Sequence, residues 1–302
     1  MSLNLNLKLV SYRAGTGTRL GVMDGEQVVD LQRAAGAIGK ELPQDMAAFI
    51  ALGDAGLDLA AQAVASGQGA VSGPVRLAPP VELRKNVFCI GRNYKAHIEE
   101  GFRARGQEPV YPKYLEIFTK PPTAVIGNED DIRWDPGFTQ QLDYEVELAL
   151  VIGKAGRQIP ADRAYDYIYG YTIGDDVSAR EVQQNHGQWF RGKSMDTSCP
   201  LGPCLVPKRS FAKPQNARLM TRVNGELRQD SNTADMLYDI GRIIEILSGG
   251  LTLEPGDVII TGTPSGVGAG RTPPAWLEDG DVVECEVEGI GVLRNRVVAA
   301  RS

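Results

Sequence analysis

Several features that would place a protein in a specialised class are scarce in this chain of 302 residues. It has four cysteines and two histidines, which is too few for a disulfide framework, and the spacing of Cys199 and Cys204 does not suit a zinc site. Acidic residues (38) exceed basic ones (32), and no basic stripe is present, so a nucleic-acid partner is not expected. No apolar run is long enough for a signal peptide or a membrane span, so no membrane partner is expected either.

The remaining composition is that of a globular protein, with 42% hydrophobic and 23% charged residues. A chain of this length can form a substantial core, and we expect two domains. Residues 1–72 are predicted to form a small α+β domain, beginning with a strand from Leu5 to Arg13. A Gly/Pro-rich linker follows, and residues 80–302 are rich in predicted strands. We therefore predict an α+β, mostly β fold with reduced thiols and a cytoplasmic location.

Strand periodicity and regularly spaced acids coincide in one short stretch. Apolar and acidic side chains alternate there in the order Leu142, Asp143, Tyr144, Glu145, Val146, Glu147 and Leu148. This period of two predicts a half-buried strand with three carboxylates on one face. Glu145 and Glu147 would then point the same way and be able to share one hard cation. The alternative is a solvated strand face without any ligand, which is the commoner meaning of such a pattern.

A second predicted strand, residues 169–176, ends in Asp175 and Asp176. If it lies beside the first strand, Asp176 becomes a third ligand. A helix is predicted to start directly at Asp176, and the junction of a strand and a helix is a common position for binding groups.

His97 lies on a short predicted helix that follows a buried strand and a Gly-Arg-Asn-Tyr turn. Glu100 is three residues further on, so its carboxylate can orient the imidazole. The alternative is an ordinary packed or surface pair. Residues 101–120 look polar and irregular, which suits either a plain surface loop or a mobile lid. Lys193 lies in a segment without clear periodicity, where a lysine is more often solvated than catalytic.

Six motifs together resemble the fumarylacetoacetate hydrolase family over about residues 80 to 300. They are residues 89–94, His97 with Glu100, and the segments 143–148, 174–180, 192–197 and 261–268. The founding hydrolase has a further aspartate ligand near the Gly-Arg-Asn-Tyr turn, where this chain has Arg92 and Asn93. The resemblance is therefore to the shorter-chain branch, which includes acylpyruvases and 2-hydroxyhepta-2,4-diene-1,7-dioate isomerases.

The resemblance implies a mixed β-roll, a homodimer, and a divalent metal (Mg²⁺ or Mn²⁺, with Ca²⁺ as a further option) held by Glu145, Glu147 and Asp176. It also implies roles for other residues in the matching motifs. His97 and Glu100 would activate water, Lys193 would face the developing oxyanion, and the contacts with substrate or its neighbours would come from Arg92, Tyr94, Arg180, Gln183 and Thr263.

The expected reaction is hydrolysis of the C–C bond of a 2,4-diketo acid, an acylpyruvate such as fumarylpyruvate or a diketo sugar acid, to pyruvate and a carboxylic acid. The metal would stabilise the leaving enolate. Decarboxylation of oxaloacetate, or isomerisation of a 5-carboxymethyl-2-hydroxymuconate-type diacid, uses the same chemistry and remains an alternative. A third possibility is an inactive metal-binding scaffold. A nucleotide-binding module is disfavoured because the loop at residues 263–270 does not open a predicted helix.

Overall fold

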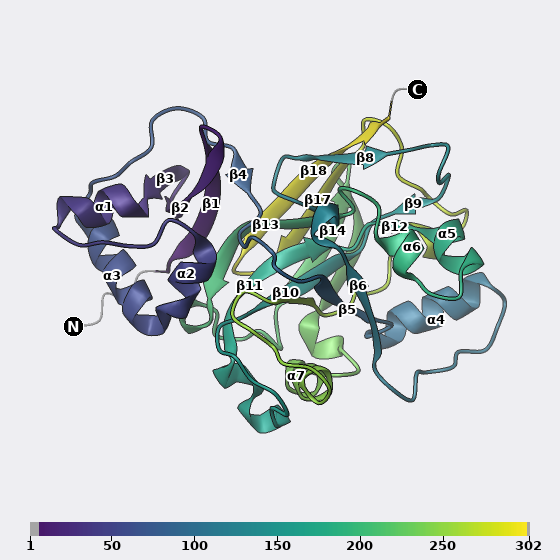
Figure 1. Ribbon diagram of the computed structural model, residues 1–302. Coiled ribbons are helices and arrows are strands. Elements are labelled where there is room, and N and C mark those ends of the chain that lie inside the picture. Colours follow the sequence, from purple (N-terminus) through teal and green to yellow (C-terminus); the bar gives the residue numbers. More distant parts are fainter. Residues whose placement is uncertain (1–5, 301–302) are drawn as a thin grey trace.

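Two β-sheets that pack face to face form the centre of the computed structural model, which describes residues 6–300 (Figure 1). The sheets have eleven and five strands, and a separate pair of short strands, β9 (Leu142–Asp143) and β12 (Ser178–Ala179), lies beside them. The prediction of an α+β, mostly β fold is confirmed.

The strands of the larger sheet have the order β3-β2-β1-β13-β11-β10-β16-β5-β6. In addition, β4 pairs with β1 and β7 pairs with β13. Its strands are β1 (Lys8–Ala14), β2 (Gly17–Asp24), β3 (Gln27–Asp30), β4 (Leu77–Ala78), β5 (Val87–Gly91), β6 (Glu116–Lys120), β7 (Val125–Ile126), β10 (Val146–Ile152), β11 (Ile168–Asp175), β13 (Cys199–Pro207) and β16 (Val258–Ile260). Of the predicted metal ligands, Glu147 lies on β10, Glu145 directly precedes β10, and Asp176 directly follows β11, so all three lie near the centre of this order.

The smaller sheet has the order β15-β14-β17-β18-β8. Its strands are β8 (Asp131–Trp134), β14 (Arg218–Val223), β15 (Glu226–Asn232), β17 (Val282–Val287) and β18 (Gly291–Ala299). The hairpin between β14 and β15 turns at Asn224 and Gly225, whose φ angles are 51° and 80°. Asn and Gly adopt positive φ more readily than other residues, so the Asn-Gly sequence explains this tight turn.

Both faces of β10 are covered, and this corrects the prediction of a half-buried strand. Val146, Leu148 and Leu150 pack against the smaller sheet in one hydrophobic cluster, whereas Ala149 and Val151 belong to a second cluster on the opposite face. All seven residues of the strand are buried. The acids in this stretch are therefore not on a solvated face, because no face of the strand is open to solvent.

The N-terminal unit, purple to blue in Figure 1, lies at one end of the larger sheet. Its helices are α1 (Leu31–Ala37), α2 (Met46–Ala51) and α3 (Gly53–Ala65), and β1 pairs with β13, with Leu9 opposite Leu205. The sheet is thus continuous between this unit and the rest of the chain. The proposed division into residues 1–72 and 80–302 stays a prediction, and residue 5, where the first strand was expected to begin, lies outside the described residues.

Within the described residues, four α-helices follow the N-terminal unit. They are α4 (Lys95–Ala104), α5 (Arg180–Asn185), α6 (Phe190–Lys193) and α7 (Ile240–Ser248). The helix expected to start at Asp176 begins at Arg180, because residues 178–179 first pair as β12 with β9. The prediction that residues 101–120 are irregular is wrong at both ends of this segment, because α4 continues to Ala104 and residues 116–120 form β6.

Within residues 6–300, no helix is long and apolar enough to cross a membrane. Cys89, Cys199, Cys204 and Cys285 are buried free thiols, as expected for reduced cysteines.

Candidate functional site

The register between β10 and β11 brings three carboxylates together. Glu147 lies opposite Gly174, and two residues along the pairing the Asp176 amide donates a hydrogen bond to the Glu145 carbonyl (2.9 Å). Side chains of alternate residues share one face of a strand, so Glu145, Glu147 and Asp176 all point to the face that also carries Ala149. Asp175 points to the opposite face, where its carboxylate accepts the Glu145 amide (2.8 Å).

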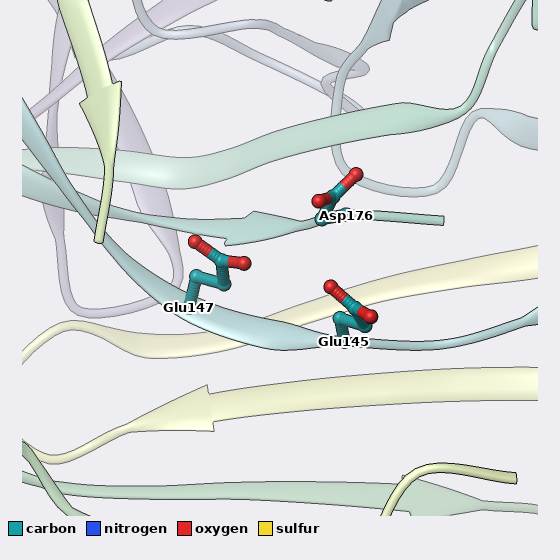
Figure 2. Close-up of side chains that lie close together, drawn as sticks. All are labelled: Glu145, Glu147 and Asp176. Atoms are coloured by element: carbon teal, nitrogen blue, oxygen red, sulfur yellow. The ribbon is translucent and has the colours of Figure 1, made fainter. Parts of the chain in front are cut away.

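One oxygen from each of Glu145, Glu147 and Asp176 lies within 4.8 Å of the others, and all three residues are buried. Figure 2 shows the three side chains grouped between their strands. The alternative of a solvated acidic face is therefore excluded by the geometry.

Three buried cations surround this group. Lys193 donates to Glu145 (2.9 Å) and to Asp176 (2.7 Å), whereas Lys120 donates to the other Asp176 oxygen (2.6 Å). Arg180 binds Glu145 (2.7 Å) and Asp143 (2.8 Å). Lys120 is fully buried and also donates to the Val177 carbonyl (3.0 Å), so its position is fixed on two sides.

Negative charge nevertheless exceeds positive charge in this buried region. Five buried carboxylates (Asp143, Glu145, Glu147, Asp175 and Asp176) face three buried cations (Lys120, Arg180 and Lys193), which leaves a formal charge of −2 if all are ionised. Burial opposes ionisation of Glu145, but Lys193 and Arg180 outweigh it and lower its pKa. The pKa of Glu147 is raised by burial and by its two carboxylate neighbours, and burial raises the pKa of Asp175 to about 7.

The donor set fits a hard divalent cation. Carboxylate oxygens are the ligands that Mg²⁺, Mn²⁺ and Ca²⁺ prefer, and a charge of +2 equals the formal deficit of the buried region. Glu147 accepts the Gly262 amide (2.5 Å) through one oxygen, which holds its carboxylate in place and leaves the other oxygen for a ligand. Glu145, Glu147 and Asp176 are thus the residues suited to hold such an ion.

Asp143 does not join this group, although the alternation placed it on the same face. The chain leaves β9 before β10 begins, and the Asp143 carboxylate instead accepts the amides of Gly268 (2.7 Å) and Ala269 (3.0 Å). Asp143 thereby connects Arg180 to the loop of residues 263–270, called the glycine-rich loop below. The prediction of three carboxylates on one face is wrong for Asp143, because the strand is interrupted.

His97 lies beside Glu100 but does not hydrogen-bond to it, since Nδ1 and the carboxylate are 3.6 Å apart. Nδ1 is buried and has no hydrogen-bond partner in the described structure. Glu100 instead accepts the Gly266 amide through both oxygens (2.9 and 3.0 Å), and its side chain fills the space beside Gly270, where a Cβ would clash. Glu100 therefore connects the helix of His97 to the glycine-rich loop.

A cavity of about 390 Å³ opens onto the carboxylates. Eight of the eleven residues predicted for the site line it: Arg92, His97, Glu145, Glu147, Arg180, Gln183, Lys193 and Thr263. Asp176 and Glu100 lie directly behind this lining, through their contacts with Lys193 and Gly266. Residues from all six sequence motifs are thus brought to one concave site.

Tyr94 is placed differently from the other candidates. It does not line the cavity, is 1% exposed, and its hydroxyl has no hydrogen-bond partner within residues 6–300. A substrate contact through Tyr94 has no support in this geometry. Thr263 does line the cavity, but its hydroxyl donates to the Val146 carbonyl (3.0 Å), so it also secures the glycine-rich loop to β10.

An aromatic wall, formed by Phe118, Trp189 and Trp276, lines the same cavity and was not indicated by the sequence. Phe118 and Trp189 meet edge to face at 5.6 Å, and Lys193 Nζ is 5.2 Å from the Phe118 ring. The ring of Trp189 occupies the space that a side chain at residue 91 would need, so only glycine fits at position 91. No local sequence pattern marks the three aromatic residues of this wall, because they come from separate segments of the chain.

Lys120 was also missed, and its burial generates a prediction. Lys120→Met should leave an Asp176 oxygen buried without its cation, lowering the free energy of unfolding by about 3 to 5 kcal/mol. Lys85→Met is the matched control, because Lys85 is 35% exposed and its pairs are screened by water, so the loss should stay below about 1 kcal/mol. Urea unfolding in the presence of a chelator measures both. Equal losses in the two variants would contradict the assigned role of Lys120.

Comparison of the sequence with known proteins finds relatives that match most of the chain. The family model described as fumarylacetoacetate (FAA) hydrolase C-terminal matches residues 86–298. Oxaloacetate tautomerase YisK of Bacillus subtilis (strain 168) is 42% identical over 288 residues, covering 91% of this chain and 94% of the relative. Oxaloacetate tautomerase FAHD2A, mitochondrial, of Bos taurus is 41% identical over 300 residues, covering 97% of this chain and 92% of the relative.

Solved structures agree over nearly the whole chain. A fumarylacetoacetate hydrolase from Exiguobacterium antarcticum is 38% identical with a TM-score of 0.77, covering 97% of this chain and 100% of that one. A 5-carboxymethyl-2-hydroxymuconate delta-isomerase from Mycobacterium smegmatis is 35% identical with a TM-score of 0.74, at 98% and 100% coverage. With the converging carboxylates and the matching motifs, these similarities establish that the chain belongs to the fumarylacetoacetate hydrolase family.

Proposed function

We propose that this protein is a divalent-metal-dependent tautomerase that interconverts the enol and keto forms of oxaloacetate or a closely similar 2-oxo acid. The observation that carries the proposal is the convergence of Glu145, Glu147 and Asp176 behind a cavity that also contains His97 and Lys193. The names of the two relatives support tautomerisation rather than the hydrolysis that we expected from the motifs. Tautomerisation proceeds through an enolate, as do the decarboxylation and the isomerisation that the sequence analysis left as alternatives.

The chemistry requires a proton to move between C3 and the oxygen on C2. A divalent ion held by the three carboxylates would supply Lewis-acid stabilisation of the negative charge that develops on the 2-oxygen. Lys193, whose ammonium lies in the cavity wall, is placed to donate to the same oxygen. Burial opposes protonation of Lys193, but Asp176 and Glu145 outweigh it and raise its pKa, so the residue stays a cation.

His97 is the residue that we assign to the proton on C3. It lines the cavity, and because its Nδ1 is buried 3.6 Å from the Glu100 carboxylate, Nε2 is the ring nitrogen that we assign to this proton exchange. Glu100 positions the helix by binding Gly266, which keeps the imidazole facing the site. The aromatic wall of Phe118 and Trp189 limits access of water on one side of the cavity.

We expect the purified protein with Mg²⁺ or Mn²⁺ to accelerate loss of the enol absorbance of oxaloacetate beyond the spontaneous rate, without releasing CO₂ or smaller acids. EDTA should abolish the acceleration, and Glu147→Gln should reduce it at least about 100-fold, since one hard ligand is lost. Glu254→Gln, a change at an exposed acid outside the cavity, is the control and should behave as wild type. Full activity in EDTA, or in Glu147→Gln, would refute the proposal.

His97→Ala should lower kcat for tautomerisation by about 100-fold or more, the usual contribution of a positioned acid–base group, while Mn²⁺ affinity stays unchanged. Added imidazole should restore part of the rate. Glu99→Ala is the control on the same helix, because Glu99 binds the Tyr111 hydroxyl (2.6 Å) and does not line the cavity. An unchanged kcat in His97→Ala would show that another group moves the proton.

Hydrolysis of a 2,4-diketo acid is the second candidate, favoured by the hydrolase from Exiguobacterium antarcticum with its similar fold. In that reaction His97 would take a proton from water instead of from carbon. Incubation with acetylpyruvate and Mg²⁺ separates the two reactions, because only hydrolysis releases pyruvate and acetate. An inactive metal-binding scaffold would show neither activity, and the predicted homodimer and cytoplasmic location stay predictions.

A further inference from the structure

One face of α4 forms part of the cavity wall. His97, Gly101 and Arg105 follow at intervals of four residues and all line the cavity. This spacing places residues on the same side of a helix, so the face extends from His97 to the C-terminal end of α4, about 12 Å along the axis. A substrate that reaches from the carboxylates past His97 therefore passes along Gly101 toward Arg105.

The cavity has four cationic side chains in its wall, and three of them already have acidic partners. Arg92 pairs with Glu116, Arg180 with Asp143 and Glu145, and Lys193 with Glu145 and Asp176. Arg105 is the fourth, and within residues 6–300 it forms no ion pair. An anion that enters the cavity thus meets one guanidinium whose charge is not already matched by an acidic side chain.

The guanidinium of Arg105 is held back along the helix rather than extended away from it. Its Cζ lies 4.7 Å from the centre of the Phe102 ring, and Nε donates weakly to the Gln107 side chain (3.3 Å). Nη1 lies beside Gly101, 3.7 Å from where a Cβ would be. Because residue 101 has no side chain, the guanidinium is able to cover this part of the cavity wall.

We propose that Arg105 binds the second carboxylate of a dicarboxylic substrate, the carboxylate remote from the 2-oxo group. This inference rests on the proposed function and extends it, because it says which part of the protein selects a diacid over a 2-oxo monoacid. A guanidinium binds a carboxylate through two parallel hydrogen bonds, which gives both affinity and orientation. His97 and Gly101 lie one helical turn apart, about 6 Å, so the guanidinium beside Gly101 is one short carbon chain away from His97.

The test compares binding of malate and lactate, two unreactive 2-hydroxy acids that differ by one carboxylate, to the Mn²⁺-loaded full-length protein by isothermal titration. Wild type should bind malate more tightly. Arg105→Gln should weaken malate binding by about 10- to 100-fold and leave lactate binding unchanged. Arg105→Lys should restore part of the difference. Arg103→Gln is the matched control, because Arg103 lies on the same last turn but outside the cavity lining.

Kinetics supply a second readout. Arg105→Gln should raise KM for oxaloacetate by a similar factor with kcat within about threefold of wild type, because the group binds substrate without moving the proton. Equal binding of malate and lactate by wild type, binding of neither, or unchanged malate binding in Arg105→Gln would overturn the inference. A wild-type protein that discriminates malate from lactate through Arg105, yet does not tautomerise oxaloacetate, would refute the proposed function alone.

Discussion

The structure depends on a concentration of negative charge among buried side chains at the base of the cavity. Charged groups are costly to bury unless they are paired, and here five carboxylates share three cations. Lys120, Arg180 and Lys193 each bind at least two acceptors, which fixes the carboxylates of Asp143, Glu145 and Asp176. Burial and the neighbouring carboxylates raise the pKa values of Glu147 and Asp175, and a divalent ion held at the carboxylates would favour their ionised forms. The pairing of the buried acids with Lys120, Arg180 and Lys193 thus links the fold to the candidate metal site.

The antiparallel pairing of β10 with β11 determines which acids converge. Because Glu147 is opposite Gly174, Asp176 falls beside Glu145, and Asp175 turns to the opposite face. A shift of one residue in this register would exchange Asp175 for Asp176. Burial of both faces of β10 makes such a shift costly, since apolar residues on each side would lose their partners. The hydrophobic core therefore protects the geometry of the site.

Much of the site was accessible from the sequence because it follows local periodicity. The alternation of apolar and acidic residues predicted Glu145 and Glu147. The end of the next predicted strand indicated Asp176, and the short helix after a buried strand indicated His97. The half-buried strand was predicted wrongly, because the alternation of acids suggested a solvated face and nothing local indicates a second covering layer. Asp143 was misplaced for a related reason, since the break between β9 and β10 arises from pairing with distant β12.

Other parts of the site arise only when distant segments meet. Lys120 ends a strand in a stretch expected to be irregular, and its partner Asp176 is 56 residues away. Tyr94 lies within a matching motif, yet the turn directs it away from the cavity. Pairing of distant cations and acids depends on tertiary structure, which a short window of sequence does not contain. The same pairing leaves Arg105 without an acidic partner among the residues that the structure describes.

The most direct test is the location of a bound ion. Crystals grown with Mn²⁺ and measured near its absorption edge should show one anomalous peak in the cavity, in contact with Glu145, Glu147 and Asp176 and facing His97. Absence of a peak there, or a peak only at acids elsewhere on the molecule, would contradict the assignment of this buried charge to a metal centre.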